Sequence, residues 1–198
     1  MDFIIIHGSP GNGKTTVAKE IHKRLEGPPW FEFGWIPEFT KKNPYTNISQ
    51  KEEEQMSFEN YILVCKNYYK HGFENVLLTD LDDVRMLDIP EVFKDYDYVI
   101  VTLYSEEDAV IKERILTRDN GNEFRNWEQS VNANRLIRNR RTLPNEYRIR
   151  SDNHTPEQIV DMIAEILKNH IKTESFSLEK YDRSEYFTYI EGYSYENL

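Results

Sequence analysis

The sequence predicts a three-layer α/β fold, in which a parallel β-sheet carries helices on both of its faces. Short apolar runs alternate along the chain with longer segments whose apolar residues recur at helical spacing. The run Tyr96–Tyr104 has a continuous β-branched core, which is typical of a central parallel strand. A glycine-rich loop directly follows the first apolar run, Phe3–Ile6, and leads into the first helical segment. These observations indicate strand–helix–strand units and hence a parallel sheet.

The first half of the chain is expected to hold three strands and two long helices. Gly27, Pro28 and Pro29 would end the first helix, and Gly72 would end the second. In order, the expected elements are a strand at Phe3–Ile6, a helix from Lys14 to about Leu25, a short strand within Trp30–Phe39, a helix from about Gln50 to Lys70 and a strand at Val76–Thr79.

The second half is expected to continue the alternation. Ser105 followed by Glu106 and Glu107 is a good helix start, because acidic side chains favour the first turn. In order, the expected elements are a helix-loop segment over 82–96, a strand at Tyr96–Tyr104, a helix from Ser105 to about Arg118, a break at 119–122, a helix over roughly Trp127–Arg141, a strand at Tyr147–Ile149 and a capped helix from Thr155.

Length and composition predict one domain with an appendage. The chain has 198 residues, the size of a single ordinary α/β domain, which we assign to residues 1–172. Residues 173–198 form an acidic, tyrosine-rich tail with almost no aliphatic side chains. The aromatic content favours docking of this tail on the domain or on a partner, and an acidic disordered tail is the alternative.

The net charge and the cysteine count indicate which partners and which compartment to expect. The formal net charge of −10 makes nucleic acid an unlikely partner, since phosphate backbones are bound through excess lysine and arginine. The single cysteine, Cys65, lies in an apolar stretch, which predicts a buried thiol and a reducing compartment. No stretch approaches the length of a membrane span, so we expect a cytoplasmic protein. We expect it to be a monomer or a homodimer.

The loop itself carries the strongest functional signal. Residues Gly8–Thr15 read GSPGNGKT and satisfy the phosphate-loop (Walker A) pattern G-x-x-x-x-G-K-[ST] between a strand and a helix. The glycines let successive amide groups turn toward an anionic phosphate, Lys14 adds a charge, and Thr15 is left to ligate magnesium. The residues expected to bind the nucleotide are Gly8, Ser9, Pro10, Gly11, Asn12, Gly13, Lys14, Thr15 and Thr16.

A second candidate group follows the strand Val76–Thr79. Asp80 lies at the carboxyl end of this strand, where ligands bind in open parallel sheets, and is the best Walker B candidate for the magnesium shell. Asp82 and Asp83 are close rivals. Capping of the following helix is the alternative role for those two residues.

Nine arginines occur between Arg114 and Arg150, which is unusual in an acidic chain. Arg114 and Arg118 are four residues apart on one expected helix face, just before a glycine-containing break. This spacing predicts a helical lid over about 114–141 that brings arginine charge, with Arg125 on the lid itself, to a triphosphate. A surface helix with Glu113 and Asp119 as partners is the alternative. For Arg138, Arg140 and Arg141 we expect solvated helix faces paired with acidic residues.

The sequence offers three candidates for a catalytic base. Glu38 is the first candidate, because it follows an aromatic segment and precedes a flexible loop, with Glu32 or Asp82 as alternatives. The surrounding aromatic residues are expected either to line a pocket for the phosphate acceptor or to join the core. They are Trp30, Phe31, Phe33, Trp35 and Phe39.

These motifs together resemble the small P-loop kinases, which include gluconate, shikimate and chloramphenicol 3-phosphotransferase-like enzymes. The likeness rests on the phosphate loop, on Asp80, on the R-x-x-x-R of Arg114 and Arg118 before RDNG, and on the terminal SDNHTPEQIVDMIAEIL. It covers about residues 1–172 and implies the P-loop NTPase fold with a five-stranded parallel sheet and a helical lid. It further implies ATP with Mg²⁺ as donor, a small hydroxylated acceptor, and adenine held by residues 152–156.

The leading expectation is therefore an ATP-dependent kinase that acts on a small molecule, with Lys14, Arg114 and Arg118 as catalytic groups. Two other functions stay open. One is a nucleotide-binding regulatory module with weak or no transfer, and the other is a polynucleotide 5'-kinase. A GTPase switch is less favoured, because the chain lacks an N-K-x-D element that would select guanine.

Overall fold

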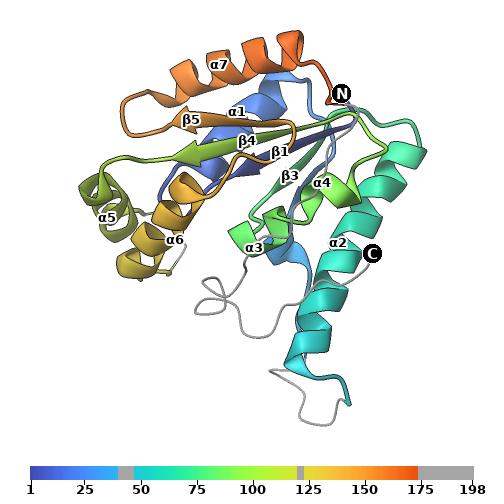
Figure 1. Ribbon diagram of the computed structural model, residues 1–198, viewed down its shortest axis with the longest axis horizontal. Helices are drawn as coiled ribbons and strands as arrows, with labels where there is room; N and C mark the ends of the chain where they lie inside the picture. Colours follow the sequence, from blue (N-terminus) through green and yellow to red (C-terminus); the bar gives the residue numbers. More distant parts are fainter. Residues whose placement is uncertain (40–46, 120–122, 174–198) are drawn as a thin grey trace.

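The computed structural model describes residues 1–39, 47–119 and 123–173 (Figure 1), so the tyrosine-rich tail lies outside the described residues apart from its first position. A five-stranded sheet forms the middle layer, with strand order β2-β3-β1-β4-β5. All neighbouring strands pair in parallel. The strands are β1 (Phe3–His7), β2 (Trp30–Glu32), β3 (Val76–Thr79), β4 (Tyr98–Tyr104) and β5 (Glu146–Arg150). The predicted five-stranded parallel sheet is confirmed.

Helices cover both faces of the sheet, as predicted. In Figure 1, α1 (Lys14–Arg24) and α7 (Pro156–Asn169) lie on one face, while α2 (Gln50–Lys70), α3 (Asp83–Met86) and α4 (Ile89–Val92) lie on the other. A short 3-10 helix, η1 (Phe33–Trp35), follows β2. Helices α5 (Asp108–Thr117) and α6 (Trp127–Asn139) pair on the side to which the arrowheads of β4 and β5 point.

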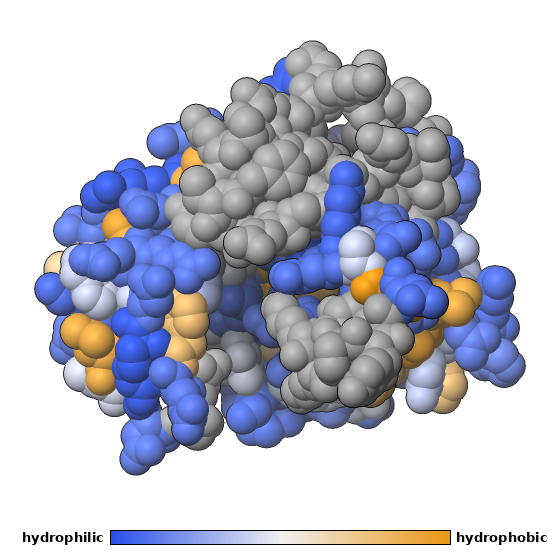
Figure 2. Space-filling model, turned by 90° about the horizontal axis from the view of Figure 1, so that it is seen from below, coloured by the Kyte–Doolittle hydropathy of each residue, from blue (hydrophilic) through white to orange (hydrophobic). Residues whose placement is uncertain are grey.

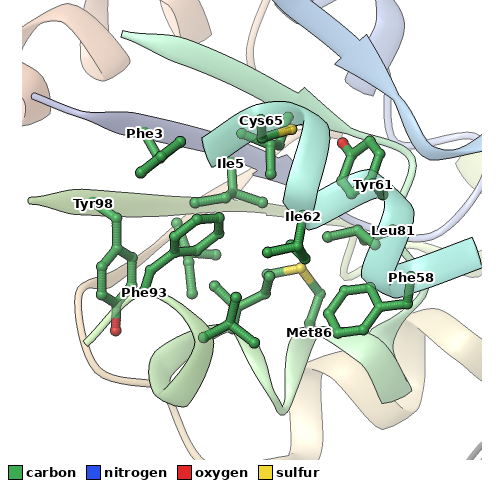
Figure 3. Close-up of a cluster of buried hydrophobic side chains, with 14 of the residues drawn as sticks. Phe3, Ile5, Phe58, Tyr61, Ile62, Cys65, Leu81, Met86, Phe93 and Tyr98 are labelled. Carbon is green, nitrogen blue, oxygen red and sulfur yellow. The ribbon is translucent and has the colours of Figure 1, made fainter. Parts of the chain in front are cut away.

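Alternation along the strands divides the core into two clusters. On β1, Phe3 and Ile5 face α2, whereas Ile4 and Ile6 face α1 and α7. Figure 3 shows the first cluster, where Phe93 stacks on Phe3 with ring centroids 4.4 Å apart. Cys65 is fully buried in this cluster, as predicted, and burial raises the pKa of its thiol. Both faces of the sheet are thus buried, which explains its nearly continuous apolar strands.

Local signals set most element boundaries where the sequence placed them. Thr155 begins α7 with a reciprocal capping box, since its hydroxyl accepts from the backbone N–H of Gln158 and the Gln158 side chain accepts from the backbone of Thr155. The fourth strand begins at Tyr98 instead of Tyr96, because the N–H of Tyr96 is taken by the carbonyl of Phe93 in the preceding turn.

The coloured part of the surface in Figure 2 is mostly hydrophilic, and its apolar residues form small separate groups. The exposed large apolar side chains of the described residues come from several elements, among them Leu63 on α2, Phe73 and Ile171. Among the helices that the structure describes, none is both long enough and apolar enough to cross a bilayer.

Candidate active site

The glycine-rich loop joins β1 to α1 at the carboxyl edge of the sheet. Three of its glycines have positive φ angles: 140° at Gly8, 89° at Gly11 and 85° at Gly13. Gly13 is also the N-cap of α1, and no side chain caps the first turn of that helix. The first N–H groups of α1 are therefore available to an anion, and the helix dipole favours negative charge there.

A buried polar network holds the loop from behind. The Asn12 side chain is 1% exposed, and its amide donates to the Ser9 hydroxyl at 2.8 Å and to Oδ1 of Asn134 in α6 at 3.2 Å. The Ser151 hydroxyl donates to Oδ1 of Asn12 at 3.0 Å. Asn134 in turn makes two hydrogen bonds to the backbone of Ser105, at the end of β4. The loop conformation is thus fixed by three other segments of the chain.

Arg114 and Arg118 both line the α1 side of the loop, but the contacts given for them differ. The Arg114 guanidinium donates to the Ser151 carbonyl at 3.0 Å and to the Gly11 carbonyl at 3.4 Å, so it braces the loop. Arg118 is the C-cap of α5 and donates to the carbonyl of Phe124, whose ring lies 5.5 Å from the guanidinium carbon.

The next helix, α6, packs against the rest of the domain through its inner face. Asn134 and Ile137 are almost fully buried on its inner face. The lid expected over 114–141 remains a prediction.

Two cavities flank the loop. The larger one, here the α1 cavity, has a volume of about 510 Å³ and extends from the start of α1 to the start of α7. Its lining contains most of the expected nucleotide-binding residues and both lid arginines. The lining residues are Pro10, Gly11, Asn12, Gly13, Lys14, Thr15, Thr16, Val17, Asp80, Arg114, Arg118, Phe124, Ser151, His154, Pro156 and Ile159.

The smaller cavity, here the α6 cavity, has a volume of about 220 Å³ and lies between the loop, the segment after β3 and the inner face of α6. Its lining is mostly apolar and includes three aspartates. The lining residues are His7, Gly8, Ser9, Pro10, Lys14, Asp80, Leu81, Asp82, Asp83, Val84, Phe124, Gln129, Ser130, Ala133, Leu136 and Ile137.

Four residues line both cavities: Pro10, Lys14, Asp80 and Phe124. The two cavities therefore meet around these four residues, which include the cation Lys14 and the anion Asp80.

The meeting point is electrostatically coupled to Glu32, the last residue of β2. The pairing of β2 with β3 sets Glu32 beside Thr79, which directly precedes Asp80. Burial raises the pKa of Glu32, and the Asp80 carboxylate acts in the same direction. Burial lowers the pKa of Lys14, while Asp80 and Glu32 oppose that effect. Two carboxylates and one lysine thus share this edge of the sheet, and an added anion would oppose the lowering of the Lys14 pKa.

Glu38 and its aromatic neighbours lie elsewhere. Glu38 lines neither cavity, and none of the five aromatic side chains of this segment lines either one. Phe31 and Phe33 pack against the core cluster under α2, whereas Trp35 and Phe39 are more than half exposed. Glu32 lines neither cavity either, but it ends β2 beside Thr79 and its charge acts on Lys14, so Glu32 is the glutamate that the structure couples to Lys14 and Asp80. Asp82, the third candidate base, lines the α6 cavity.

The two rivals of Asp80 have structural partners. Asp82 is the N-cap of α3, accepts from the backbone N–H of Arg85 at 2.9 Å and pairs with the Arg85 guanidinium. Asp83 is 7% exposed and lies between His7, at 2.9 Å, and Arg140, at 2.8 Å.

Arg140 departs from the expectation of a solvated helix face. Its side chain is 5% exposed and pairs with both Asp83 and Glu146. The helix α6 ends at Asn139, so Arg140 turns inward into this cluster. Sequence spacing carried no sign of this, because the partners come from β3–α3 and β5.

Oxygen groups suited to a hard cation face the α1 cavity. Thr15 and Asp80 both line it, and a hydroxyl and a carboxylate are ligands that Mg²⁺ prefers. Among residues 1–39, 47–119 and 123–173, no group of three or more His, Cys, Asp or Glu side chains is arranged to hold a metal alone. This donor set fits Mg²⁺, which is bound through one or two protein ligands together with phosphates.

The fold is shared with solved kinases. The chain is similar to a sugar kinase from a Janibacter species, with a TM-score of 0.60 at 15% identity over 85% of this chain and 95% of that one. It is similar to a gluconokinase from Sinorhizobium meliloti, with a TM-score of 0.57 at 15% identity over 85% and 98% of the two chains. A tunicamycin resistance protein from Deinococcus radiodurans gives a TM-score of 0.59 at 20% identity over 87% and 98%.

No protein-family model matches the sequence, and no curated protein matches it. At these identities the likeness to the solved structures is one of fold. The chain has the three-layer fold of the small P-loop kinases.

Proposed function

We propose that this protein is an ATP-dependent phosphotransferase, which moves the γ-phosphate of ATP to a hydroxyl group of a small molecule. The observation that carries the proposal is that Lys14 and Asp80 line both cavities. In this proposal ATP occupies the α1 cavity, with its phosphates on the loop, and the acceptor occupies the α6 cavity. The γ-phosphate then lies where the cavities meet.

The loop supplies most of the phosphate contacts in this proposal. Backbone N–H groups from Gly8–Thr15 and the start of α1 donate to the phosphate oxygens, and Lys14 neutralises the charge between donor and acceptor. Residues Ser151, His154 and Pro156 line the far end of the α1 cavity and are our candidates for contacting the base. Arg118 contributes cationic charge to the transferred group, while Arg114 keeps the loop in position through Gly11 and Ser151.

Thr15 and Asp80 are the proposed protein ligands of Mg²⁺. When bound, the ion neutralises the bridging phosphate charge that develops during transfer.

The transfer itself is an in-line displacement. A bond forms between the acceptor oxygen and the γ-phosphorus as the bond from that phosphorus to the β–γ bridging oxygen breaks, and ADP leaves. The hydroxyl proton passes to a carboxylate. We assign this role to Glu32 through one water, since Glu32 lines neither cavity, because burial and the neighbouring Asp80 make its carboxylate more ready to accept a proton.

The testing experiment is a transfer assay with γ-labelled ATP and Mg²⁺ on purified protein. The acceptor panel contains neutral alcohols, sugars, sugar acids, nucleosides, aminoglycosides and oligonucleotides, and Lys14→Ala protein is the blank. Label on one acceptor class supports a small-molecule kinase. Label only on oligonucleotide 5' ends would replace it with a polynucleotide kinase, and ATP binding without transfer to any class would favour a regulatory module.

A further inference from the structure

We propose that the acceptor is an uncharged molecule with a mostly apolar body and a terminal hydroxyl group, and that carboxylate-bearing acceptors are excluded. This inference rests on the proposed function, because it concerns the occupant of the α6 cavity in that reaction. It goes further by assigning the chemical class of that occupant from the walls of the cavity.

The walls of the α6 cavity away from the loop are apolar. Leu81 and Val84 contribute one wall from the segment after β3, and Ala133, Leu136 and Ile137 contribute the facing wall from α6. Phe124 adds an aromatic side chain to the lining and also lines the α1 cavity. A polyhydroxylated sugar would leave several of its hydroxyl groups against these side chains without partners, whereas an apolar body would gain from the burial.

Uncharged polar groups in the lining are few. Gln129 and Ser130, in the first turns of α6, provide an amide and a hydroxyl. Ser9 of the loop adds a second hydroxyl, which already accepts a hydrogen bond from the Asn12 amide. His7 also lines the cavity, but Nδ1 of its ring is 3.2 Å from the Leu81 carbonyl oxygen and Nε2 is 2.9 Å from Asp83. The cavity therefore has polar groups for one or two hydroxyls of an acceptor, not for a ring of them.

The charges in the lining disfavour an anion. Of the described residues that line the cavity, Lys14 is the one lysine, and no arginine is among them. Asp80, Asp82 and Asp83 all line it. A bound carboxylate would lose its hydration without gaining a cationic partner from the described lining, because Lys14 is committed to phosphate in the proposed reaction and the charges of Asp82 and Asp83 are already paired within the protein.

Two arginines form ion pairs with aspartates of the cavity lining. Arg85 is 2% exposed and pairs with Asp82 and Glu54. Arg140 pairs with Asp83 and Glu146. These pairs also mean that the aspartates already have cationic partners, so a cationic acceptor gains little from them.

The volume of the α6 cavity fits a small acceptor molecule. The cavity measures about 220 Å³. An apolar protein cavity of about 150 Å³ holds benzene, so this one holds roughly nine non-hydrogen atoms, about the size of a substituted ring.

Three probes of nearly equal size isolate the effect of charge. They are 4-isopropylbenzyl alcohol, 4-(hydroxymethyl)benzoate and 4-(aminomethyl)benzyl alcohol, which are neutral, anionic and cationic at pH 7.5. We would measure Kd for each by ligand-observed NMR titration of the full chain, saturated with a non-hydrolysable ATP analogue and Mg²⁺. Phosphorylation of each probe by γ-labelled ATP would be followed in parallel.

The neutral probe is expected to bind at least about tenfold more tightly than either charged probe. Ala133→Phe fills the cavity and should remove this binding, while the affinity for the ATP analogue stays within about twofold. Asn132→Phe is the matched control, because Asn132 is exposed on the same helix and lines neither cavity. Ala133→Arg places a guanidinium in the lining and should shift the preference toward the benzoate.

Benzoate or amine binding as tight as that of the neutral probe would overturn the inference. So would absence of neutral-probe binding, or binding that survives Ala133→Phe. Failure of the proposed function has a different signature: the ATP analogue does not bind, or the neutral probe binds in the α6 cavity without accepting phosphate at any concentration.

Discussion

The side-chain amide of Asn12 donates a hydrogen bond to Oδ1 of Asn134, 3.2 Å away, and so joins the glycine-rich loop to helix α6. Both side chains are at most 1% exposed. The same Asn134 oxygen accepts from the backbone N–H of Ser105 at 3.0 Å. One asparagine therefore sets the distance between the wall of the α6 cavity and the loop that the proposal assigns to the phosphates.

We predict that Asn134→Ala lowers both stability and nucleotide affinity. The substitution leaves the buried N–H of Ser105 and the amide of Asn12 without this acceptor, at a cost of about 1–3 kcal/mol in the free energy of unfolding. A less fixed loop should weaken ATP-analogue binding up to about tenfold. Urea unfolding and calorimetric titration measure the two effects. Asn132→Ala, at an exposed position of the same helix, should change neither; equal behaviour of the two variants would remove the bracing role.

Two glycines of the loop are expected to differ in their tolerance of a side chain. A Cβ atom at Gly8 would lie 2.3 Å from the backbone oxygen of Leu103, and the φ angle there is 140°. At Gly13 the φ angle is 85°, but a Cβ atom would meet nothing within 4 Å.

Gly8→Ala should therefore cost about 3 kcal/mol or more, from overpacking and backbone strain together. Gly13→Ala should cost about 1–2 kcal/mol, from strain alone. Urea unfolding midpoints compare the two proteins directly. Similar losses would show that the contact with Leu103 relaxes.

Substitutions of the charged residues near the meeting point of the cavities should have different kinetic effects. Lys14→Ala is expected to abolish transfer with the fold intact, and circular dichroism and the urea midpoint would verify the fold. Lys23→Ala, in the last turn of the same helix, is the control and should keep full activity. Retained transfer in Lys14→Ala would contradict the phosphate-loop assignment.

Arg118→Ala should lower kcat more than it weakens ATP binding, because the proposal places its charge on the transferred group. The split between kcat and the Kd for ATP is the readout. A loss of ATP affinity with unchanged kcat would make Arg118 a ground-state binding group.

The proton acceptor can be tested with two glutamates. Glu32→Gln should lower kcat by about 100-fold or more with little change in ATP affinity, since a positioned base contributes about 10²–10⁴ to rate. Glu38→Gln should stay close to wild type, because Glu32, and not Glu38, ends the strand beside Thr79 and is coupled to Lys14. The reverse order of effects would return the role to Glu38.

The sequence was a good guide to the fold because its signals are local. A glycine loop between a strand and a helix, apolar runs for buried strands and a threonine cap at 155 each act within a few residues, and their elements lie where they were predicted. The strand order and the burial of Arg140 depend on tertiary contacts, which local sequence signals do not report. Arg140 meets Asp83 and Glu146 through tertiary contacts, and no spacing along the chain reports those partners.

In the candidate site too, some residues could be found from local sequence signals and others could not. Asp80 was placed from its strand end alone, and it does line both cavities. Glu32 was ranked below Glu38 because the register of β2 against β3, which sets Glu32 beside Thr79, is a property of the sheet. Asn134 was not singled out at all. Only its position on the inner face of α6, with Ser130 and Ile137, could have marked it as buried.

The buried cluster around Asp83 should make stability depend on acid pH. Burial alone would raise the pKa of Asp83, but the hydrogen bond with His7 and the charge of Arg140 lower it from 3.8 to about 2. Because the folded-state pKa is depressed, the carboxylate stabilises the fold fully above about pH 4, and this contribution is lost as pH falls toward about 2. Glu146, whose pKa is also lowered, adds a dependence of the same sign.

We therefore predict that Asp83→Asn lowers the free energy of unfolding by about 2 kcal/mol at pH 7 and by much less at pH 2.5. Urea unfolding across this pH range measures the narrowing gap between variant and wild type. Asp161→Asn is the matched control, because Asp161 pairs with Arg24 on the exposed surface, where such a pair contributes about 0–1 kcal/mol. A gap for Asp83→Asn that stays constant with pH would mean that the carboxylate acts through packing and not through its charge.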